Sequence, residues 1–252
     1  MLLKKNRLRI GKVLLGTRPA IALTITDLES PQALLKAKRL GAGLLEVRID
    51  RFRRLDERQI LQRIHSLKRV GLPLIATIRS QKEGGRRFLS ESQRVELFKK
   101  ILPKVDAIDL ELASKHLCQA LIPLAHRKGK RVILSYHNFR TTPADSTLED
   151  FIQRAQRRGA DIVKIAVTPK KNSDTARLLL LTQRNRGKNL ISIAMGPRGA
   201  PSRILAPLFG SLVTYSYIGR PPSGPYGPKG RRQALGQLPL KRFSKELQAI
   251  LK

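Results

Sequence analysis

The sequence has few of the residues that build disulfides, cysteine metal sites, aromatic platforms or membrane helices. Cys118 is the only cysteine among 252 residues, which excludes an internal disulfide and a multi-cysteine metal site. Tryptophan is absent and aromatic residues make up 4% of the chain, too few for a surface that stacks single-stranded nucleic acid. No apolar run approaches the roughly 18 residues of a membrane helix. The opening residues, 1–7, lack the apolar core of a signal peptide, so we expect a soluble, cytoplasmic protein that binds no membrane.

Acidic residues are also scarce. Asp and Glu number 18 against 51 Lys and Arg, which gives a formal net charge of +33, and such a charge is typical of proteins that bind polyanions. The basic residues, however, form small clusters along the whole chain, such as Arg86-Arg87 and Arg157-Arg158, rather than one tail or one helix. We therefore interpret the charge as a solvated basic surface and predict no specific nucleic-acid partner.

Short β-like runs alternate with helix-like segments along the chain. Each of eight such runs is followed by a helix-like segment, which favours an α/β fold with a single (β/α)8 TIM barrel domain, residues 1–252, over an open doubly wound sheet. The expected strands are 21–26, 44–50, 73–79, 107–112, 131–137, 161–167, 189–196 and 212–219. The expected helices are 31–40, 56–70, 90–102, 114–127, 148–158, 174–182, 202–209 and 240–251.

Local signals support these boundaries. Ser30 precedes a proline at the first position of a helix, and Ser90 with Gln93 has the form of a capping box. Glycines such as Gly41 and Gly159 stand where a helix must end before the next strand. Residues 1–20 resemble a hairpin, which we expect to close the bottom of the barrel.

The alternation of side chains along each strand places charged residues inside the barrel. In Glu46-Val47-Arg48, the apolar parity must face the helices, so Glu46 and Arg48 point inward. The same test places further side chains on the inward parity: Thr77 with Arg79, Asp109 with Glu111, Ser135 with His137, Lys164, and Met195 with Ile193. Each alone could be a buried ion pair. Together, near the C-terminal ends of strands where barrel enzymes assemble their sites, they indicate catalysis.

Lys164 is the most informative of these residues, because a buried ammonium must find partners or lose its proton. Among four histidines only His137 ends a strand, whereas the others lie in helical segments: His65, His116 and His126. A lysine beside a histidine suggests Schiff-base catalysis, in which the amine attacks a ketone and the histidine removes a proton from the neighbouring carbon. No metal-ligand spacing occurs, so we expect no metal and no cofactor.

The amine must be neutral to attack. Lowering its pKa from about 10.4 to about 8 requires roughly 3 kcal/mol, which we expect from burial and a nearby cation, Arg48 or Arg203. Arginines at the rim would bind an anionic substrate, most specifically a carboxylate held by two hydrogen bonds.

Several short motifs follow one another in a specific order. They are Glu46-Val47-Arg48-Ile49-Asp50, Thr77-Ile78-Arg79-Ser80 leading into Glu83-Gly84-Gly85, Ser135-Tyr136-His137-Asn138-Phe139, Val163-Lys164-Ile165-Ala166, Met195-Gly196 with Ser202-Arg203, and Gly236-Gln237. Each motif alone is weak. The ordered series, from about residue 21 to residue 240, resembles the type I 3-dehydroquinate dehydratases, enzymes of the shikimate pathway that leads to chorismate and the aromatic amino acids.

The resemblance implies a lyase that converts 3-dehydroquinate into 3-dehydroshikimate without a cofactor or metal. It implies a Schiff base on Lys164, with His137 as general base and acid, Glu46 orienting His137, and Arg203 binding the substrate carboxylate. The other positions that match substrate or pocket contacts are Arg48, Arg79, Gln237, Met195, Tyr215 and Thr24. Related bacterial enzymes are often dimers, so we expect a homodimer.

The chain departs from the family pattern after the eighth strand. Gln233-Ala234-Leu235-Gly236-Gln237 lacks a hydroxyl and a proline that the family carries, and residues 220–235 look like an inserted loop or lid. The missing hydroxyl contact could be replaced by Ser223, Lys229 or Gln233. An alternative alignment places Ser223 and Pro225 on the motif, which would remove Gln237 from the site.

Two other functions fit parts of the sequence. Another class I Schiff-base barrel, of the aldolase or transaldolase kind, also uses a strand lysine, but the Glu46-x-Arg48 element and the strand-end His137 fit the dehydratase better. A basic nucleic-acid-binding barrel without catalysis would explain the charge but not the interior residues. It predicts tight nucleic-acid binding that survives Lys164→Ala.

Overall fold

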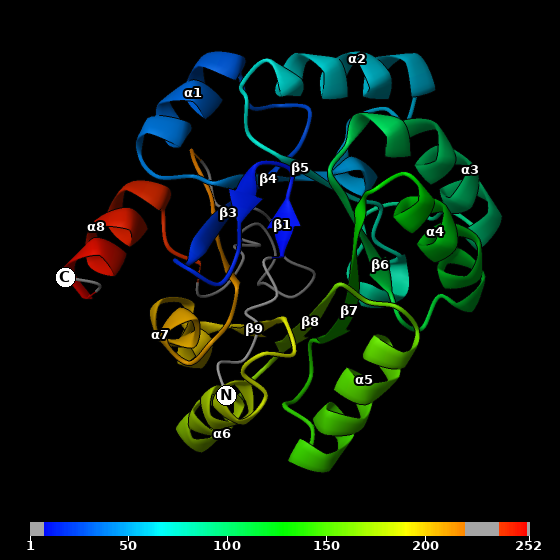
Figure 1. The fold of residues 1–252 in the computed structure, drawn as a ribbon. Helices are drawn as coiled ribbons and strands as arrows, with labels where there is room; N and C mark the ends of the chain where they lie inside the picture. Colours follow the sequence, from blue (N-terminus) through cyan, green and yellow to red (C-terminus); the bar gives the residue numbers. More distant parts are fainter. Residues whose placement is uncertain (1–7, 220–236, 251–252) are drawn as a thin grey trace, which may run out of the picture.

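Eight parallel strands form one sheet that curves into a barrel, as predicted (Figure 1). The computed structural model describes residues 8–219 and 237–250. The strand order is β10-β3-β4-β5-β6-β7-β8-β9, and the Leu212 N–H donates to the Leu190 carbonyl at 2.8 Å where β10 meets β9. The strands are β3 (Ala20–Ile25), β4 (Leu44–Arg48), β5 (Leu74–Thr77), β6 (Ala107–Glu111), β7 (Arg131–Asn138), β8 (Ile162–Val167), β9 (Leu190–Ala194) and β10 (Val213–Ser216).

Helices follow the strands and surround the sheet (Figure 1). They are α1 (Pro31–Arg39), α2 (Glu57–Lys68), α3 (Glu91–Ile101), α4 (Lys115–Arg127), α5 (Asp145–Arg157), α6 (Asn172–Arg184), α7 (Ser202–Leu208) and α8 (Leu240–Ile250). The short 3-10 turns are η1 (Ile49–Arg51), η2 (Gln81–Glu83), η3 (Leu102–Lys104) and η4 (Pro197–Gly199). Every predicted helix is present, and the largest error at a helix start is at α5, which begins at Asp145 rather than at residue 148.

The residues predicted to begin and end helices do so in the structure. The Ser30 side chain accepts a hydrogen bond from the Ala33 N–H at 3.2 Å, and Ser90 and Gln93 form a complete capping box. Gly41 adopts a left-handed φ of 97° after α1, a conformation that a residue with a side chain rarely adopts.

A small antiparallel hairpin, β1 (Arg9–Ile10) and β2 (Val13–Leu14), lies at the bottom of the barrel. Ile10 is fully buried in one cluster with Ile75 and Ala107, which begin neighbouring strands of the barrel. The Arg9 carbonyl also accepts a hydrogen bond from Arg131 at 3.2 Å. The structure thus has a hairpin at residues 9–14, within the predicted range 1–20, packed against the lower end of the barrel, while residues 1–7 lie outside the described part of the chain.

One apolar core packs against each face of the sheet. The outer core joins strand residues such as Val47 and Ile165 to the helices. The inner core fills the barrel from the bottom with residues including Ile133 and Ile191. Because apolar residues occupy the lower interior, the polar side chains of the predicted parity meet near the C-terminal ends of the strands.

Cys118 lies in α4 and is buried. Burial raises the pKa of its thiol to about 11, as expected for a packed, unreactive cysteine. Within residues 8–219 and 237–250, no helix is long and apolar enough to cross a membrane.

Candidate active site

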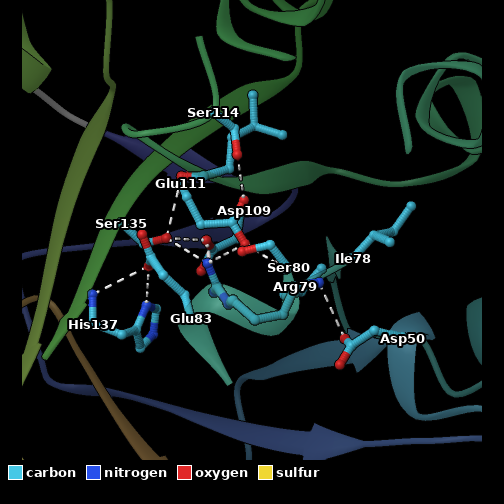
Figure 2. Close-up of polar contacts among 12 residues, drawn as sticks. Asp50, Ile78, Arg79, Ser80, Glu83, Asp109, Glu111, Ser114, Ser135 and His137 are labelled. Atoms are coloured by element: carbon cyan, nitrogen blue, oxygen red, sulfur yellow. Dashed lines mark hydrogen bonds and ion pairs between the residues drawn. The ribbon is translucent and has the colours of Figure 1, made fainter. Parts of the chain in front are cut away.

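Adjacent strands bring the inward polar side chains together inside the barrel. We call the cluster around Lys164, which includes Glu46, Asp109 and Tyr215, the Lys164 chamber. The register pairs Arg48 with Thr77 and Thr77 with Asp109, and it pairs Ser135 with Lys164 on the next two strands. Figure 2 shows the part of this network that surrounds the Arg79 guanidinium.

Lys164 is buried, with 3% of its surface exposed. Its Nζ donates to Asp109 Oδ2 at 3.0 Å and to Glu46 Oε1 at 3.5 Å, and it lies 4.4 Å from the centre of the Tyr215 ring. Burial alone would lower the pKa of this ammonium, but Asp109 and Glu46 outweigh burial and raise it. Lys164 is therefore charged in this structure.

The expectation that burial and a nearby cation bring the pKa of Lys164 down is not met, because the two carboxylates outweigh both burial and the opposing charge of Arg79. Of the two cations expected to do this, Arg48 directs its guanidinium to Asp50, with Nε and Nη2 each 2.9 Å from a carboxylate oxygen. Strand parity identified the residues that face the interior, but not which of them lies nearest the amine. The nearest partner is the carboxylate of Asp109.

Arg79 is a buried link between three neighbouring groups. Its Nη1 donates to Ser135 Oγ at 2.6 Å and its Nη2 to Asp109 Oδ1 at 2.9 Å, and Nη1 lies 3.5 Å from Glu111 Oε1 (Figure 2). The two carboxylates outweigh burial and raise the pKa of Arg79. Burial by itself would raise the pKa of Asp109, but Arg79 and Lys164 lower it. The guanidinium is thus already engaged by protein partners, and its predicted contact with substrate stays a prediction.

His137 is held by Glu83, not by the Glu46 that the resemblance implied. Its Nδ1 lies 2.8 Å from Glu83 Oε2, and its backbone N–H donates to the same oxygen at 3.2 Å (Figure 2). Burial, with Arg79 and Lys164 nearby, lowers the pKa of His137 well below its ordinary value. Burial also raises the pKa of Glu83 to about 8, against the opposing charge of Arg79.

The turn after β5 places Glu83 beside His137. Residues 81–83 form η2, and the Gly85 N–H closes the turn onto the Ser80 carbonyl at 2.7 Å. A side chain at Gly85 would put its Cβ 2.0 Å from the Arg79 carbonyl oxygen, so only glycine fits. The base of the turn is tied to Asp50, which accepts the Arg79 N–H at 3.2 Å.

Glu46 faces Lys164. It accepts a hydrogen bond from Thr77 Oγ1 at 2.8 Å through the same oxygen that faces the lysine, and 3% of the residue is exposed. In the described part of the chain it forms no ion pair with an arginine. Within the described residues, its carboxylate therefore contacts the lysine and forms no hydrogen bond with the histidine.

Arg203 and Gln237 have buried polar atoms that lack partners. Arg203, at the start of α7, is 5% exposed, and its Nε forms no hydrogen bond within residues 8–219 and 237–250. Burial lowers its pKa to about 10. Gln237 Oε1 is likewise buried without a described partner. An unpaired buried guanidinium is costly, and an anionic ligand would relieve that cost.

The remaining predicted contacts occupy the barrel interior or its edge. Tyr215 is buried on β10 beside Lys164, and Met195, just after β9, packs against the inner core. Thr24 on β3 pairs in register with Glu46. The predicted lid, 220–235, with Ser223, Lys229 and Gln233, lies outside the described residues. Within the described residues, no three His, Cys, Asp or Glu side chains are grouped to hold a metal ion.

Two residues of the site received no role from the sequence. Glu83 belonged to a quoted motif, and the following Gly84-Gly85 pair was the signal that its turn folds back tightly. Asp109 was placed inward, but its contact with Lys164 depends on the distance across two strands, which parity does not give.

Comparisons with known proteins agree on one family. A model of the family described as Type I 3-dehydroquinase matches residues 20–251 of this chain. The 3-dehydroquinate dehydratase of Aquifex aeolicus is 36% identical over 195 residues, which cover 77% of this chain and 87% of that protein. The enzyme of the same name from Geobacillus thermodenitrificans is 31% identical over 265 residues, which cover 100% of this chain and 99% of that protein.

Solved structures agree with this likeness. The 3-dehydroquinate dehydratase of Geobacillus kaustophilus superposes with a TM-score of 0.85 at 29% identity, covering 97% of this chain and 96% of that one. The type I enzyme of Clostridium difficile, solved with covalently modified comenic acid, superposes with a TM-score of 0.85 at 26% identity, covering 98% of both chains.

Proposed function

The chain belongs to the type I 3-dehydroquinase family of hydro-lyases that dehydrate 3-dehydroquinate, and we propose that its reaction proceeds through a Schiff base on Lys164. The observation that carries the proposal is the buried Lys164 ammonium between two carboxylates, Asp109 and Glu46. The product, 3-dehydroshikimate, would continue toward chorismate and the aromatic amino acids.

The first step requires Lys164 to lose a proton. Asp109 is held by Arg79 and Ser135, which stabilise its charge, whereas Glu46 accepts, among the described residues, only a hydroxyl hydrogen bond besides the lysine. Glu46 is therefore the better acceptor. The neutral amine adds to the ketone carbon of the substrate, and the resulting carbinolamine loses water to give an iminium that withdraws electrons from the adjacent carbon.

The second step uses His137. Glu83 occupies Nδ1, and Nε2 forms no hydrogen bond with the described residues. When Nδ1–H donates to an ionised Glu83, Nε2 carries the lone pair and can take the proton from the carbon beside the iminium. The same proton then passes to the departing hydroxyl, which leaves as water. Hydrolysis of the remaining imine returns Lys164 and releases the enone product.

The buried Arg203 supplies the carboxylate contact. Its unpartnered Nε and its place near Tyr215, which lines the Lys164 chamber, favour an anionic group there. A guanidinium binds a carboxylate through two parallel hydrogen bonds, which also fixes the orientation of the ring. Gln237 Oε1 is available to a substrate hydroxyl.

Borohydride trapping tests the proposal. Reduction of a mixture of the protein and 3-dehydroquinate should leave a stable adduct on Lys164, located by peptide mass spectrometry, and mixing without borohydride should produce the absorbance of an enone. Lys164→Ala should abolish both signals, whereas Lys68→Ala, an exposed lysine of α2, should keep them. An adduct without enone formation would favour an aldolase-like reaction, and neither signal in the unmodified protein would reject the mechanism.

The family also leads us to propose a cytoplasmic homodimer that needs neither metal nor cofactor. Light scattering after size-exclusion chromatography should give twice the mass of the 28.3 kDa chain. Turnover should be unchanged after dialysis against a chelator.

A further inference from the structure

A cavity of about 650 Å³ lies on the outer side of the barrel wall, between the ends of β6 and β7 and helix α5. Leu112, Tyr136 and Phe151 form its apolar wall, and the two rings stack at a tilt with centres 5.3 Å apart. Its volume falls within the range of small-molecule sites, roughly 300–1,000 Å³. The residues that line the cavity do not include Lys164 or Arg203.

Four cationic side chains surround this apolar wall. Arg154, Arg157 and Arg158 stand three and four residues apart at the end of α5, and Lys115 faces them from the start of α4. Within residues 8–219 and 237–250, Arg154 pairs with the exposed Asp150, while the other three side chains form no ion pair or hydrogen bond. The charge of Arg158 acts against burial on the pKa of the Cys118 thiol in α4.

The positive charges around the cavity are not balanced by nearby negative charges of the described residues. Like charges three and four residues apart on a helix repel one another, and the helix dipole at the C-terminus of α5 offsets only part of that repulsion. Glu83 is the single acidic residue lining the cavity, and its carboxylate is already bonded to His137. A bound anion would therefore complete the charge balance while an attached ring covered Tyr136 and Phe151.

We propose that this cavity is a second binding site, separate from the Lys164 chamber, for a small organic anion that carries a planar ring, such as an aryl phosphate or an aromatic carboxylate. The cationic side chains bind the anionic group and the apolar wall packs against the ring. The cationic side chains and the rings that carry the proposal take no part in the reaction described above, although Glu83 and Ser135, which contact His137 and Arg79, also line the cavity.

Calorimetric titration at physiological salt tests both halves of the site with three probes. Phenyl phosphate has the ring and the charge, inorganic phosphate has only the charge, and phenol has only the ring. Phenyl phosphate should bind at least about tenfold more tightly than either of the others, since each half contributes on the order of 1.4 kcal/mol or more. Equal affinity for phenyl and inorganic phosphate would reject the apolar wall as part of the site.

Variants then locate the binding. Arg157→Ala and Lys115→Ala, on opposite sides of the cavity, should each weaken phenyl phosphate binding about tenfold, the loss of one charge-assisted contact. Arg58→Ala removes an exposed arginine of α2 and should leave the affinity unchanged, as should Arg203→Ala. Thermal unfolding confirms that each variant is folded. Binding lost only in Arg203→Ala, weakened equally in Arg58→Ala, unchanged in both cavity variants, or absent in the unmodified protein overturns the proposal.

Discussion

At the scale of single residues, the site is built around two protons. One is on Lys164, where Asp109 and Glu46 keep the amine charged, and it must leave before the amine can attack. The other is shared between His137 and Glu83 across 2.8 Å. Each proton controls a different step, so variants of the two residues should stop the reaction at different points.

Replacing His137 should stop the reaction after the Schiff base has formed. His137→Ala should lower turnover about 10²- to 10⁴-fold, the usual contribution of a positioned general base, yet Lys164 should still react with the ketone. Borohydride should then trap an adduct heavier by one water molecule than the adduct of the dehydrated product. His116→Ala, an exposed histidine of α4, serves as the control with normal turnover. A dehydrated adduct accumulating in His137→Ala at the normal rate would contradict the role of His137.

Glu83 should set the acid side of the pH–activity profile. A protonated Glu83 donates to Nδ1 and leaves the hydrogen of the imidazole on Nε2, which cannot then act as a base. Because burial raises the pKa of Glu83 to about 8, kcat/KM should rise with pH and level off above about 8. Glu83→Gln removes this titration, so the rise should move to lower pH even though turnover falls. An unchanged profile in Glu83→Gln would assign the titration to another group.

The raised pKa of Glu83 also predicts that the free energy of unfolding falls as the pH rises. The folded protein holds the Glu83 proton above the ordinary pKa of the side chain, so this stabilisation is present below about 4.3 and disappears as the pH passes through about 8. Urea unfolding across this range should show a smaller decline in Glu83→Gln than in the unmodified protein. Glu149→Gln, which removes a partly exposed carboxylate of α5, should retain the full decline.

At the scale of elements, the short turn at η2 holds several parts of the site in place. It ties β5 to Asp50, closes on Gly85 and presents Glu83 to β7. Two strands, β5 and β7, and the turn η1 after β4 therefore depend on one turn for their alignment at the site. A small change in the backbone of this turn should therefore lower turnover without altering the fold of the barrel.

Gly85→Ala tests this dependence. The added Cβ would lie 2.0 Å from the Arg79 carbonyl oxygen, so the turn must shift, at a loss of stability on the order of 1–3 kcal/mol. Turnover should fall as well, because Glu83 moves away from His137. Gly43→Ala is the matched control, since its Cβ would meet nothing closer than 3.8 Å. Equal, small effects of the two substitutions on unfolding and turnover would contradict the argument.

The order of the elements was predictable from the sequence, but part of the site was not. Alternation of apolar residues fixed which face of each strand carries Glu46, Arg79 and Lys164, because that pattern is local. The pKa of Lys164 and the partner of His137 depend instead on distances between strands and on the path of a turn. No local pattern carries those distances, so Asp109 received no role, and Glu46 was predicted to make the contact with His137 that Glu83 makes in the structure.

At the scale of the whole molecule, the charge of +33 surrounds a site for an anionic substrate. A positive potential accelerates the encounter with an anion, and salt screens it over about 8–10 Å near physiological ionic strength. Steering should therefore make kcat/KM fall roughly tenfold between low and high salt, while kcat stays constant because the bound substrate no longer diffuses.

Salt anions that compete for Arg203 would also lower kcat/KM, and a comparison of two salts separates the effects. Screening depends on ionic strength alone, whereas competition depends on the anion. Sodium chloride and sodium sulfate at matched ionic strength should thus give the same decline if the basic surface steers the substrate. A decline seen only with sulfate would assign the effect to an anion bound in the protein, and a flat profile in both salts would show that the charge has no part in substrate capture.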